Sequence, residues 1–470
     1  MIRYITISIL LFVATLPTFA QNDASKIIPA ISILLLEEDD SECDSILTCF
    51  VILNGTTIDI TNSTYDPDCE SLLECFVVNN TQRSSEIFTD GTQTTGVLED
   101  IQSVTTVTED GIDFISLETT GIPQYDVIIS AGNIDELNNR PRAQINDFLS
   151  GETTAVAGDT VVFGQDIGYG GNLQTICETT GGYGYWPPGP DCASNTESVQ
   201  LYPANPNEEV VEECSTGLDN IGVMINGASI FNWGDGMSYN NAGAFQNLAP
   251  LAEFYDVDIC GGHAASGNYH HHGYTTCLAD LVGDDGSDHS PIYGVMADGY
   301  PLYGPYESNA ILAKSGWLIR DYDSGTNETG CSDGARSCVM VDAFDASLGT
   351  EVASSNGPAF DEEVESLSSN LFIAYNGFYF EDYYYGGGAA TGAQLDEHNG
   401  HDNNDGRGYH YHITLEQVDS GGLAPAFPFI IGPSFYGEVH DNAVANCSGD
   451  AGGGGGPGGG GPGGGGPPGL

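Results

Sequence analysis

The segment Gly408-Tyr409-His410-Tyr411-His412-Ile413-Thr414 alternates phenol and imidazole side chains before it becomes β-branched. An alternating run of this kind indicates a β-strand rather than a helix. Side chains two residues apart lie on the same face of a strand, because the backbone repeats every two residues. We therefore expect His410 and His412 to lie side by side, with Tyr409 and Tyr411 on the opposite face.

The histidines of this chain are concentrated in two windows. Nine of the ten fall within residues 263–289 and 398–412. The first window contains Tyr269-His270-His271-His272, where the strand period places His270 and His272 on one face and His271 on the other. Two neighbouring strands that each present a pair of imidazoles can build a site with three or four nitrogen ligands. We therefore expect the two windows to meet in space.

Clustered imidazoles indicate a transition-metal site, since neutral imidazole binds zinc, copper, nickel and iron. We expect copper or zinc. The candidate ligands are His263, His270, His272, His398, His401, His410 and His412. The spacing matches neither a zinc finger, nor an HExxH zincin, nor a deaminase signature. The alternative is that these histidines are structural, because alternating Tyr and His can also form a simple hydrogen-bonded strand.

Three carboxylates near these motifs are candidate acid/base groups. Asp396 and Glu397 directly precede His398, so they could also supply oxygen ligands or hold the second ring nitrogen of a ligand. Asp298 begins the turn Asp298-Gly-Tyr-Pro-Leu-Tyr-Gly-Pro305. Its alternative role is a side-chain hydrogen bond to the backbone of that turn. The residues leave open whether the protein is an enzyme.

The composition predicts a mainly-β protein. Its 470 residues include 64 Gly and 22 Pro but very few Lys, which favours short strands and turns over long surface helices. Short β-branched or aromatic runs occur at 103–108, 114–117, 125–129 and 160–163. The stretch 344–367 is expected to include a helix, because residues 361–367 read Asp-Glu-Glu-Val-Glu-Ser-Leu. We expect a compact sandwich- or barrel-like domain with long loops.

The chain is strongly acidic. Asp and Glu total 67 against 9 Lys and Arg, which gives a formal net charge of −58. Affinity for nucleic acid depends on Lys and Arg that neutralise phosphates, so nucleic acid is excluded as a partner. Anionic lipid is disfavoured as well. A negative field of this size instead concentrates cations, including metal ions, around the protein.

The N-terminus is typical of a secretory signal peptide. Arg3, the apolar run 5–16 and Thr18-Phe19-Ala20 form its basic, apolar and cleavage regions. We therefore expect an extracellular protein with no integral membrane segment after cleavage. Five Asn-X-Ser/Thr triplets would be glycan acceptors in a eukaryotic host: Asn54, Asn62, Asn79, Asn327 and Asn446.

The 12 cysteines agree with export, because disulfides persist in oxidising compartments. We expect no free thiol. Cys260 and Cys277 bracket the first histidine window, and a disulfide that clamps this loop is favoured over thiolate ligation of a metal. Local spacing suggests four further pairs, although spacing cannot fix connectivity: Cys43/Cys49, Cys69/Cys75, Cys177/Cys192 and Cys331/Cys338.

Composition divides the chain into five parts. The signal peptide (1–20) is followed by a small Cys-rich appendage (21–81), in which Cys43-Asp-Ser-Ile-Leu-Thr-Cys49-Phe-Val recurs as Cys69-Glu-Ser-Leu-Leu-Glu-Cys75-Phe-Val. Polar residues 82–100 are expected to form a linker. Residues 101–445 form the β-rich domain. The Gly/Pro-rich tail (446–470) is expected to be a disordered, flexible coil.

Several of these segments, in this order, resemble the YHYH-domain family of secreted proteins, named after the motif present here at 409–412. The resemblance covers a motif core at 221–436 and extends more loosely upstream to 101. It implies no particular activity, since the family has no settled one. The supporting segments are Met224–Asn232, Cys260–His263, Tyr269–His272, His289–Gly294, Asp298–Pro305 and Leu395–Gly400.

Two departures from the family pattern concern the candidate ligands. His271 stands where the family more typically repeats the Tyr-His alternation. His398 and the region of Pro433 stand where the family often has cysteines. A disulfide there is thus replaced by an extra potential ligand.

Three functions follow from these observations. The first is a secreted protein that binds copper or zinc through clustered histidines. The second is an extracellular metal-dependent hydrolase or oxidoreductase, for which an open coordination position is diagnostic. The third is an acidic matrix or surface-interaction protein, with an extracellular partner of unidentified kind and structural histidines.

Overall fold

The computed structural model describes residues 92–440 with gaps, together with a few residues before them. Contacts divide the chain into units 1–42 and 43–470, and every described residue belongs to the second. The expected signal peptide, nearly all of the Cys-rich appendage and the Gly/Pro tail lie outside the described residues. The described ranges are 76, 82, 87–89, 92–139, 148, 150–168, 193–209, 214–218, 220–242, 244–254, 257–322, 336, 340–341, 349–350, 357–365, 371–387, 394–418 and 422–440.

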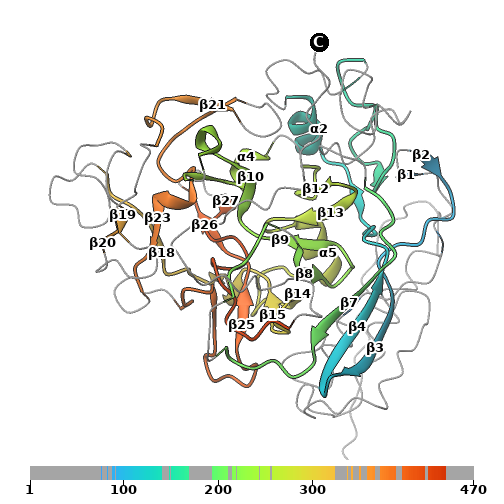
Figure 1. Cartoon of the computed structure of the whole chain (residues 1–470). Helices are drawn as coiled ribbons and strands as arrows, with labels where there is room; N and C mark the ends of the chain where they lie inside the picture. Colours follow the sequence, from blue (N-terminus) through green and yellow to red (C-terminus); the bar gives the residue numbers. More distant parts are fainter. Residues whose placement is uncertain are drawn as a thin grey trace, which may run out of the picture. The chain divides into compact units, whose positions relative to one another are not determined.

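An open eight-stranded sheet carries the histidine motifs (Figure 1). Its strand order is β12-β13-β9-β8-β14-β15-β25-β24. The pairs β13–β9 and β15–β25 are parallel, and all the other pairs are antiparallel. The strands are β8 (Asn220–Met224), β9 (Ser229–Phe231), β12 (Gly262–Ala265), β13 (Asn268–His271), β14 (Ile292–Met296), β15 (Pro301–Tyr303), β24 (Gly400–His401) and β25 (His410–His412).

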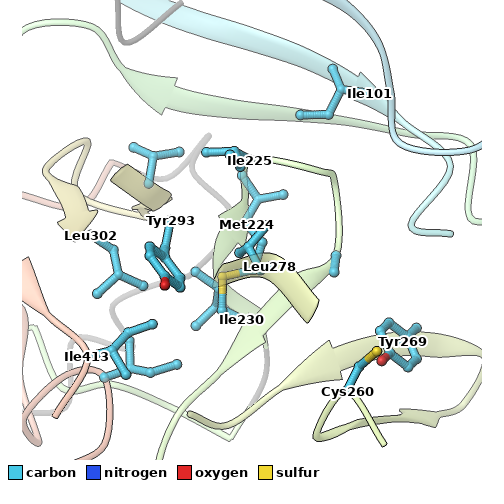
Figure 2. Packing of buried hydrophobic residues seen from close by; sticks show 14 of the residues in the cluster. Ile101, Met224, Ile225, Ile230, Cys260, Tyr269, Leu278, Tyr293, Leu302 and Ile413 are labelled. Atoms are coloured by element: carbon cyan, nitrogen blue, oxygen red, sulfur yellow. The ribbon is translucent and has the colours of Figure 1, made fainter. Parts of the chain in front are cut away.

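The central strands of this sheet are built from continuous apolar sequence. All five residues of β14, Ile-Tyr-Gly-Val-Met, are buried, as expected for a strand that is covered on both faces. Met224 and Ile230 from the β8–β9 hairpin pack with Tyr293 and Leu302 from the β14–β15 hairpin (Figure 2). Leu278 of helix α5 (Thr276–Val282) belongs to the same core.

A second sheet of three antiparallel strands shares this core. It consists of β3 (Ile101–Glu109), β4 (Ile112–Thr119) and β7 (Ser198–Pro203), in the order β3-β4-β7. Its buried side chains, among them Leu117 and Tyr202, join the same apolar cluster as Val223 of β8. The two sheets therefore belong to one β-rich unit.

The remaining strands form two-stranded antiparallel sheets, and the helices are short. None of the helices in the described part of the chain is long and apolar enough to cross a membrane. The paired strands are β1 (Ile87–Thr89) with β2 (Thr92–Thr94), β5 (Asp126–Ile128) with β6 (Thr160–Val162), β10 (Gly234–Ser238) with β11 (Gln246–Leu248), β16 (Tyr306–Ser308) with β17 (Ile311–Leu312), β18 (Trp317–Ile319) with β23 (Tyr383–Tyr385), β19 (Met340–Val341) with β20 (Gly349–Thr350), β21 (Glu363–Glu365) with β22 (Leu371–Ile373), and β26 (Leu415–Gln417) with β27 (Leu423–Pro425). The other helical segments are α2 (Ala131–Asn138), α4 (Ala249–Ala252), η3 (Tyr239–Asn241) and η4 (Phe380–Asp382).

The mainly-β prediction is confirmed, and strands β3, β4, β5 and β6 occupy the four runs expected to be strands. The barrel-like alternative is not confirmed, because no sheet in the described residues closes on itself. The prediction of a helix around 361–367 is wrong, because residues 363–365 form strand β21. Val364 is buried there between exposed Glu363 and Glu365, which is the two-residue period of a strand.

The stretch 82–100, expected to be a linker, contains the β1–β2 hairpin. At the end of the stretch the side chains of Glu99 and Asp100 are buried. Polar, Thr-rich sequence is compatible with a hairpin, so polarity alone does not separate a linker from a strand pair.

Candidate metal centres

Three imidazoles and a carboxylate converge at the β12–β13 edge of the large sheet. We call Glu253, His263, His270 and His272 the first cluster. Glu253 directly follows helix α4, His263 lies on β12, and His270 and His272 lie on and just after β13. One ligand atom from each residue lies within 4.8 Å of those of the other three, and the three histidines are buried.

The ring nitrogens of the first cluster are oriented by the backbone. Nδ1 of His270 lies 2.9 Å from the carbonyl oxygen of Asn268, and Nδ1 of His272 lies 2.6 Å from that of Asn232. A carbonyl oxygen only accepts, so each Nδ1 carries the proton and each Nε2 presents a lone pair. These lone-pair nitrogens lie 3.0 Å apart.

The same centre is approached by the Glu253 carboxylate. Its Oε2 lies 3.1 Å from Nε2 of His263 and 3.0 Å from Nε2 of His272. Ligands at about 2.0–2.1 Å around a tetrahedral ion are roughly 3.3 Å from one another. The spacing of the first cluster therefore suits such an ion.

The charges of the first cluster match a cation. Burial lowers the pKa of His270 well below its usual value. Burial would raise the pKa of Glu253, but attraction to His272 and His263 holds that pKa well below its usual range. Burial also opposes protonation of His272, whose pKa is nevertheless raised by the Glu253 charge. The cluster thus combines an ionised carboxylate with imidazole nitrogens.

A second group of imidazoles lies at the β25–β24 edge of the sheet. We call Glu307, His289, His401, His410 and His412 the second cluster. Its ligand atoms form two sets within 4.8 Å, one of His289, His410 and His412 and one of Glu307, His401 and His412. Oε2 of Glu307 lies 3.2 Å from Nε2 of His401 and 3.5 Å from Nε2 of His412.

Backbone carbonyls orient these rings as well. Nδ1 of His289, His410 and His412 lies 2.7–2.8 Å from the carbonyl oxygens of Ser290, Gly408 and Gly304 respectively. Within the described part of the chain, their three Nε2 atoms are buried without a hydrogen-bond partner. Each Nε2 thus presents a lone pair toward its neighbours.

The pKa shifts of His289, His410 and His412 favour their neutral imidazole forms. Burial lowers the pKa of His410 to about 3 and that of His412 well below its usual value. Burial also lowers the pKa of His289. Burial would raise the pKa of Glu307, but its contacts with His401 lower that pKa to about 2.

The strand-face predictions are confirmed. His410 and His412 lie together in the second cluster, while Tyr409 and Tyr411 contact each other on the opposite face. His271 is turned away from His270 and His272. Its Nε2 lies 3.0 Å from the hydroxyl of Tyr125. The additional histidine at this position therefore serves a buried hydrogen bond rather than the first cluster.

The expectation that the two windows build one site is wrong. Four strands, β9, β8, β14 and β15, lie between β13 and β25. The strands β13 and β25 are therefore roughly 24 Å apart. Each histidine strand pairs with a hairpin of its own, β13 with β9 and β25 with β15. Of the first window, His289 joins the second cluster, and the structure builds two sites instead of one.

Four sequence-predicted site residues lie outside both clusters. His398 directs Nδ1 to Ser434, 3.1 Å from its carbonyl oxygen. The Glu397 carbonyl accepts a hydrogen bond from the Trp317 indole. The other two, Asp396 and Asp298, serve the phenol face of the sheet.

Asp396 accepts hydrogen bonds from the hydroxyl of Tyr409, at 3.0 and 3.1 Å from its two carboxylate oxygens. Asp298 accepts one from Tyr411 at 2.5 Å and one from the backbone of Tyr300 at 3.2 Å. The turn role considered for Asp298 is therefore confirmed, and burial raises its pKa to about 6.

Sequence reasoning missed three contributors, Glu253, His289 and Glu307. Glu253 and Glu307 stand outside both histidine windows, so spacing gave no signal for them. His289 stood inside the first window but was not among the candidate ligands. The disulfide Cys260–Cys277, in contrast, is confirmed and brackets three of the first cluster's ligands.

A family model described as YHYH protein matches residues 200–419. No curated protein and no solved structure matches this chain. The matched segment contains both histidine clusters, including the Tyr-His-Tyr-His strand after which the family is named. The chain therefore contains a YHYH domain over residues 200–419.

Proposed function

We propose that this YHYH domain binds a divalent transition metal, zinc or copper, through its clustered histidines. The first cluster supports the proposal best. The observation that carries it is the convergence of imidazole lone pairs on one carboxylate. His270 and His272 donate their Nδ1 protons to carbonyls and bring their Nε2 atoms to 3.0 Å from each other. Two lone pairs at this distance repel each other unless a cation or proton lies between them.

A purely structural role for these histidines fits less well. Structural histidines are satisfied by their hydrogen-bond partners, because an unpaired polar group in the interior is costly. In the described residues, Nδ1 of His263 is buried without a hydrogen-bond partner, while its Nε2 lies 3.1 Å from Glu253. Metal coordination would satisfy this ring.

The donor set favours a binding site over a catalytic one. Structural zinc sites are closed by four protein ligands, whereas catalytic sites keep a position for water. The first cluster offers four protein donors. A hydrolase or oxidoreductase would need an open position, so we propose metal binding as the function of this cluster.

We also propose that the protein works outside the cytosol. The support is its signal-like N-terminus and the disulfide Cys260–Cys277, since disulfides persist in oxidising compartments. In such a medium the −58 charge of the chain would concentrate cations near the protein.

The test is elemental analysis of the purified chain, followed by calorimetric titration of the metal-stripped protein with Zn²⁺ and Cu²⁺ at pH 7.5 and pH 5. We expect tight binding at pH 7.5 that weakens at pH 5, because protons compete for imidazole. The double variant H263A/H272A should lose the ion held by the first cluster. Glu253→Gln should weaken that ion while keeping the shape of the site, and His440→Ala, outside both clusters, is the control. Equal binding by the wild type and H263A/H272A would refute the proposal.

A further inference from the structure

The two halves of the large sheet repeat each other. Residues 221–224 read Ile-Gly-Val-Met and residues 293–296 read Tyr-Gly-Val-Met. In both hairpins the methionine N–H donates to a carbonyl four residues later, from Met224 to Ala228 at 2.8 Å and from Met296 to Tyr300 at 2.9 Å. The turn glycines Gly227 and Gly299 have φ values of 85° and 88°. The hairpins are therefore copies of one unit.

The halves are also related across the centre of the sheet. The N–H of Ile225 donates to the carbonyl of Tyr293, and the N–H of Ala297 donates to the carbonyl of Ile221, both at 2.9 Å. These two bonds join equivalent positions reciprocally, as a two-fold axis between β8 and β14 requires. Read outward from this axis, the strands β8-β9-β13-β12 of one half correspond to β14-β15-β25-β24 of the other.

The ligand-bearing loops repeat as well. Asp258 accepts hydrogen bonds from the N–H of Gly262 at 3.1 Å and from the Tyr269 hydroxyl at 2.9 Å. Asp396 accepts from the N–H of Gly400 at 3.1 Å and from the Tyr409 hydroxyl. Before each glycine stands a residue with positive φ, Gly261 at 74° and Asn399 at 72°.

The candidate ligands occupy equivalent positions in this repeat. In both halves a carboxylate oxygen approaches the Nε2 atoms of the first and last histidine. In both, the carbonyl that holds the last histidine ends the hairpin unit, at Asn232 and Gly304. The equivalent pairs are Glu253 with Glu307, His263 with His401, His270 with His410, and His272 with His412.

We propose that the second cluster is a second transition-metal site, related to the first by internal duplication, and that His289 gives it a fifth donor. This inference rests on the proposed function. Equivalent residues of the two hairpins have a constant separation in the chain, as Gly227 and Gly299 do. This separation makes Gly217 the counterpart of His289, and glycine has no side-chain donor. The ring of His289 lies 5.5 Å from that of His410 and 5.1 Å from that of His412, measured between centroids.

The aromatic side chain beside each cluster also differs, and the second cluster again has the more polar residue. Phe231 stacks on His270 in the first half, with ring centroids 3.8 Å apart. Tyr303 takes the equivalent place beside His410, at 4.8 Å, and lies 4.9 Å from His289. The second site thus has one more nitrogen and one more hydroxyl than the first. A five-donor set favours an ion that accepts more than four ligands, whereas the first cluster matches tetrahedral zinc.

Cobalt(II) tests both parts of this proposal, because tetrahedral cobalt absorbs visible light more strongly than five-coordinate cobalt. The full chain, stripped of metal, is titrated with Co²⁺ and followed by absorption and equilibrium dialysis. We expect two ions in the wild type and one in each of H263A/H272A and H401A/H410A. The ion retained by H263A/H272A should give the weaker five-coordinate spectrum. Adding His289→Ala to that variant should convert the spectrum to the stronger tetrahedral form.

The outcomes separate this inference from the proposed function. One ion that is lost in H263A/H272A but kept in H401A/H410A overturns the second site and leaves the proposed function intact. One ion with the opposite pattern places the metal in the second cluster alone and overturns the first cluster as the site of the proposed function. An unchanged spectrum after His289→Ala overturns the fifth donor. Should H401A/H410A fail to fold, Glu307→Gln is the substitute and is expected to weaken one ion of two, while equal binding of both ions would overturn the assignment.

Discussion

The Nε2 atoms of His270 and His272 lie 3.0 Å apart, while a backbone carbonyl holds the Nδ1 proton of each ring. The carbonyls come from different elements, since Asn268 starts β13 and Asn232 follows β9. The parallel pairing of these two strands therefore fixes both rings before any ion arrives. Such preorganisation lowers the cost of ordering the ligands on binding.

Metal binding should stabilise the fold. An ion that binds only the folded state adds about 2.7 kcal/mol to the free energy of unfolding at a free concentration 100 times its Kd. Thermal unfolding of the metal-stripped chain, with and without Zn²⁺, measures this effect. H263A/H272A should keep only the part of the stabilisation that comes from the second cluster. Identical midpoints with and without the ion in the wild type would contradict the prediction.

A side chain at Gly262 should disrupt the first cluster. A Cβ at this position would lie 2.4 Å from the Tyr269 hydroxyl oxygen, and the adjacent residue is His263. Gly262→Ala should lower the free energy of unfolding by about 1–3 kcal/mol, as overpacking does in other cores. Urea unfolding checks this, with Gly217→Ala as the control, because a Cβ at Gly217 meets nothing within 4 Å. Gly400→Ala should behave like Gly262→Ala, since a Cβ there also lies 2.4 Å from a tyrosine hydroxyl.

Titration of Asp298 should make the wild type less stable as the pH rises from about 4 to about 6. Burial raises the pKa of Asp298 from 3.8 to about 6 in the folded state. The folded state then holds more protons than the unfolded state in this range, so the free energy of unfolding falls by at most about 3 kcal/mol.

Asp298→Asn removes this titration, and the equivalent position in the other half already holds Asn226. The free energy of unfolding of the wild type minus that of the variant, measured by urea unfolding at pH 4, 5, 6 and 7, should therefore decrease as the pH rises. It should level off above pH 6. A difference that stays constant over this range would show that Asp298 does not titrate there.

Opening the Cys260–Cys277 disulfide should weaken the first cluster and leave the second unchanged. The disulfide closes a loop with a sequence separation of 17 that contains His263, His270 and His272. Loss of a crosslink over such a loop costs about 3 kcal/mol in the chain-entropy account. C260S/C277S should release the first-cluster ion faster in a chelator competition while the second ion dissociates at its wild-type rate. Equal release of both ions would show that the loop is held by other contacts.

Local sequence determined the strands and their faces. The alternation at 409–412 was enough to place His410 beside His412, because side-chain direction in a strand depends only on the two-residue backbone repeat. The same rule separated His271 from its neighbours. The disulfide Cys260–Cys277 followed from its position around a single loop. These features involve residues that are close in the chain, so the sequence specifies them directly.

The tertiary structure alone decided which residues share a site. Glu253 reaches His263 and His272 only because a short helix ends beside β12 and β13, and Glu307 reaches His412 because β15 pairs with β25. The order of strands in the sheet separated the two histidine windows, which their shared concentration of imidazoles had suggested would meet. Strand order depends on how apolar faces and backbone hydrogen bonds are satisfied across the whole sheet. A local pattern cannot express that choice, since equivalent hairpins with nearly the same sequence pair with different partners.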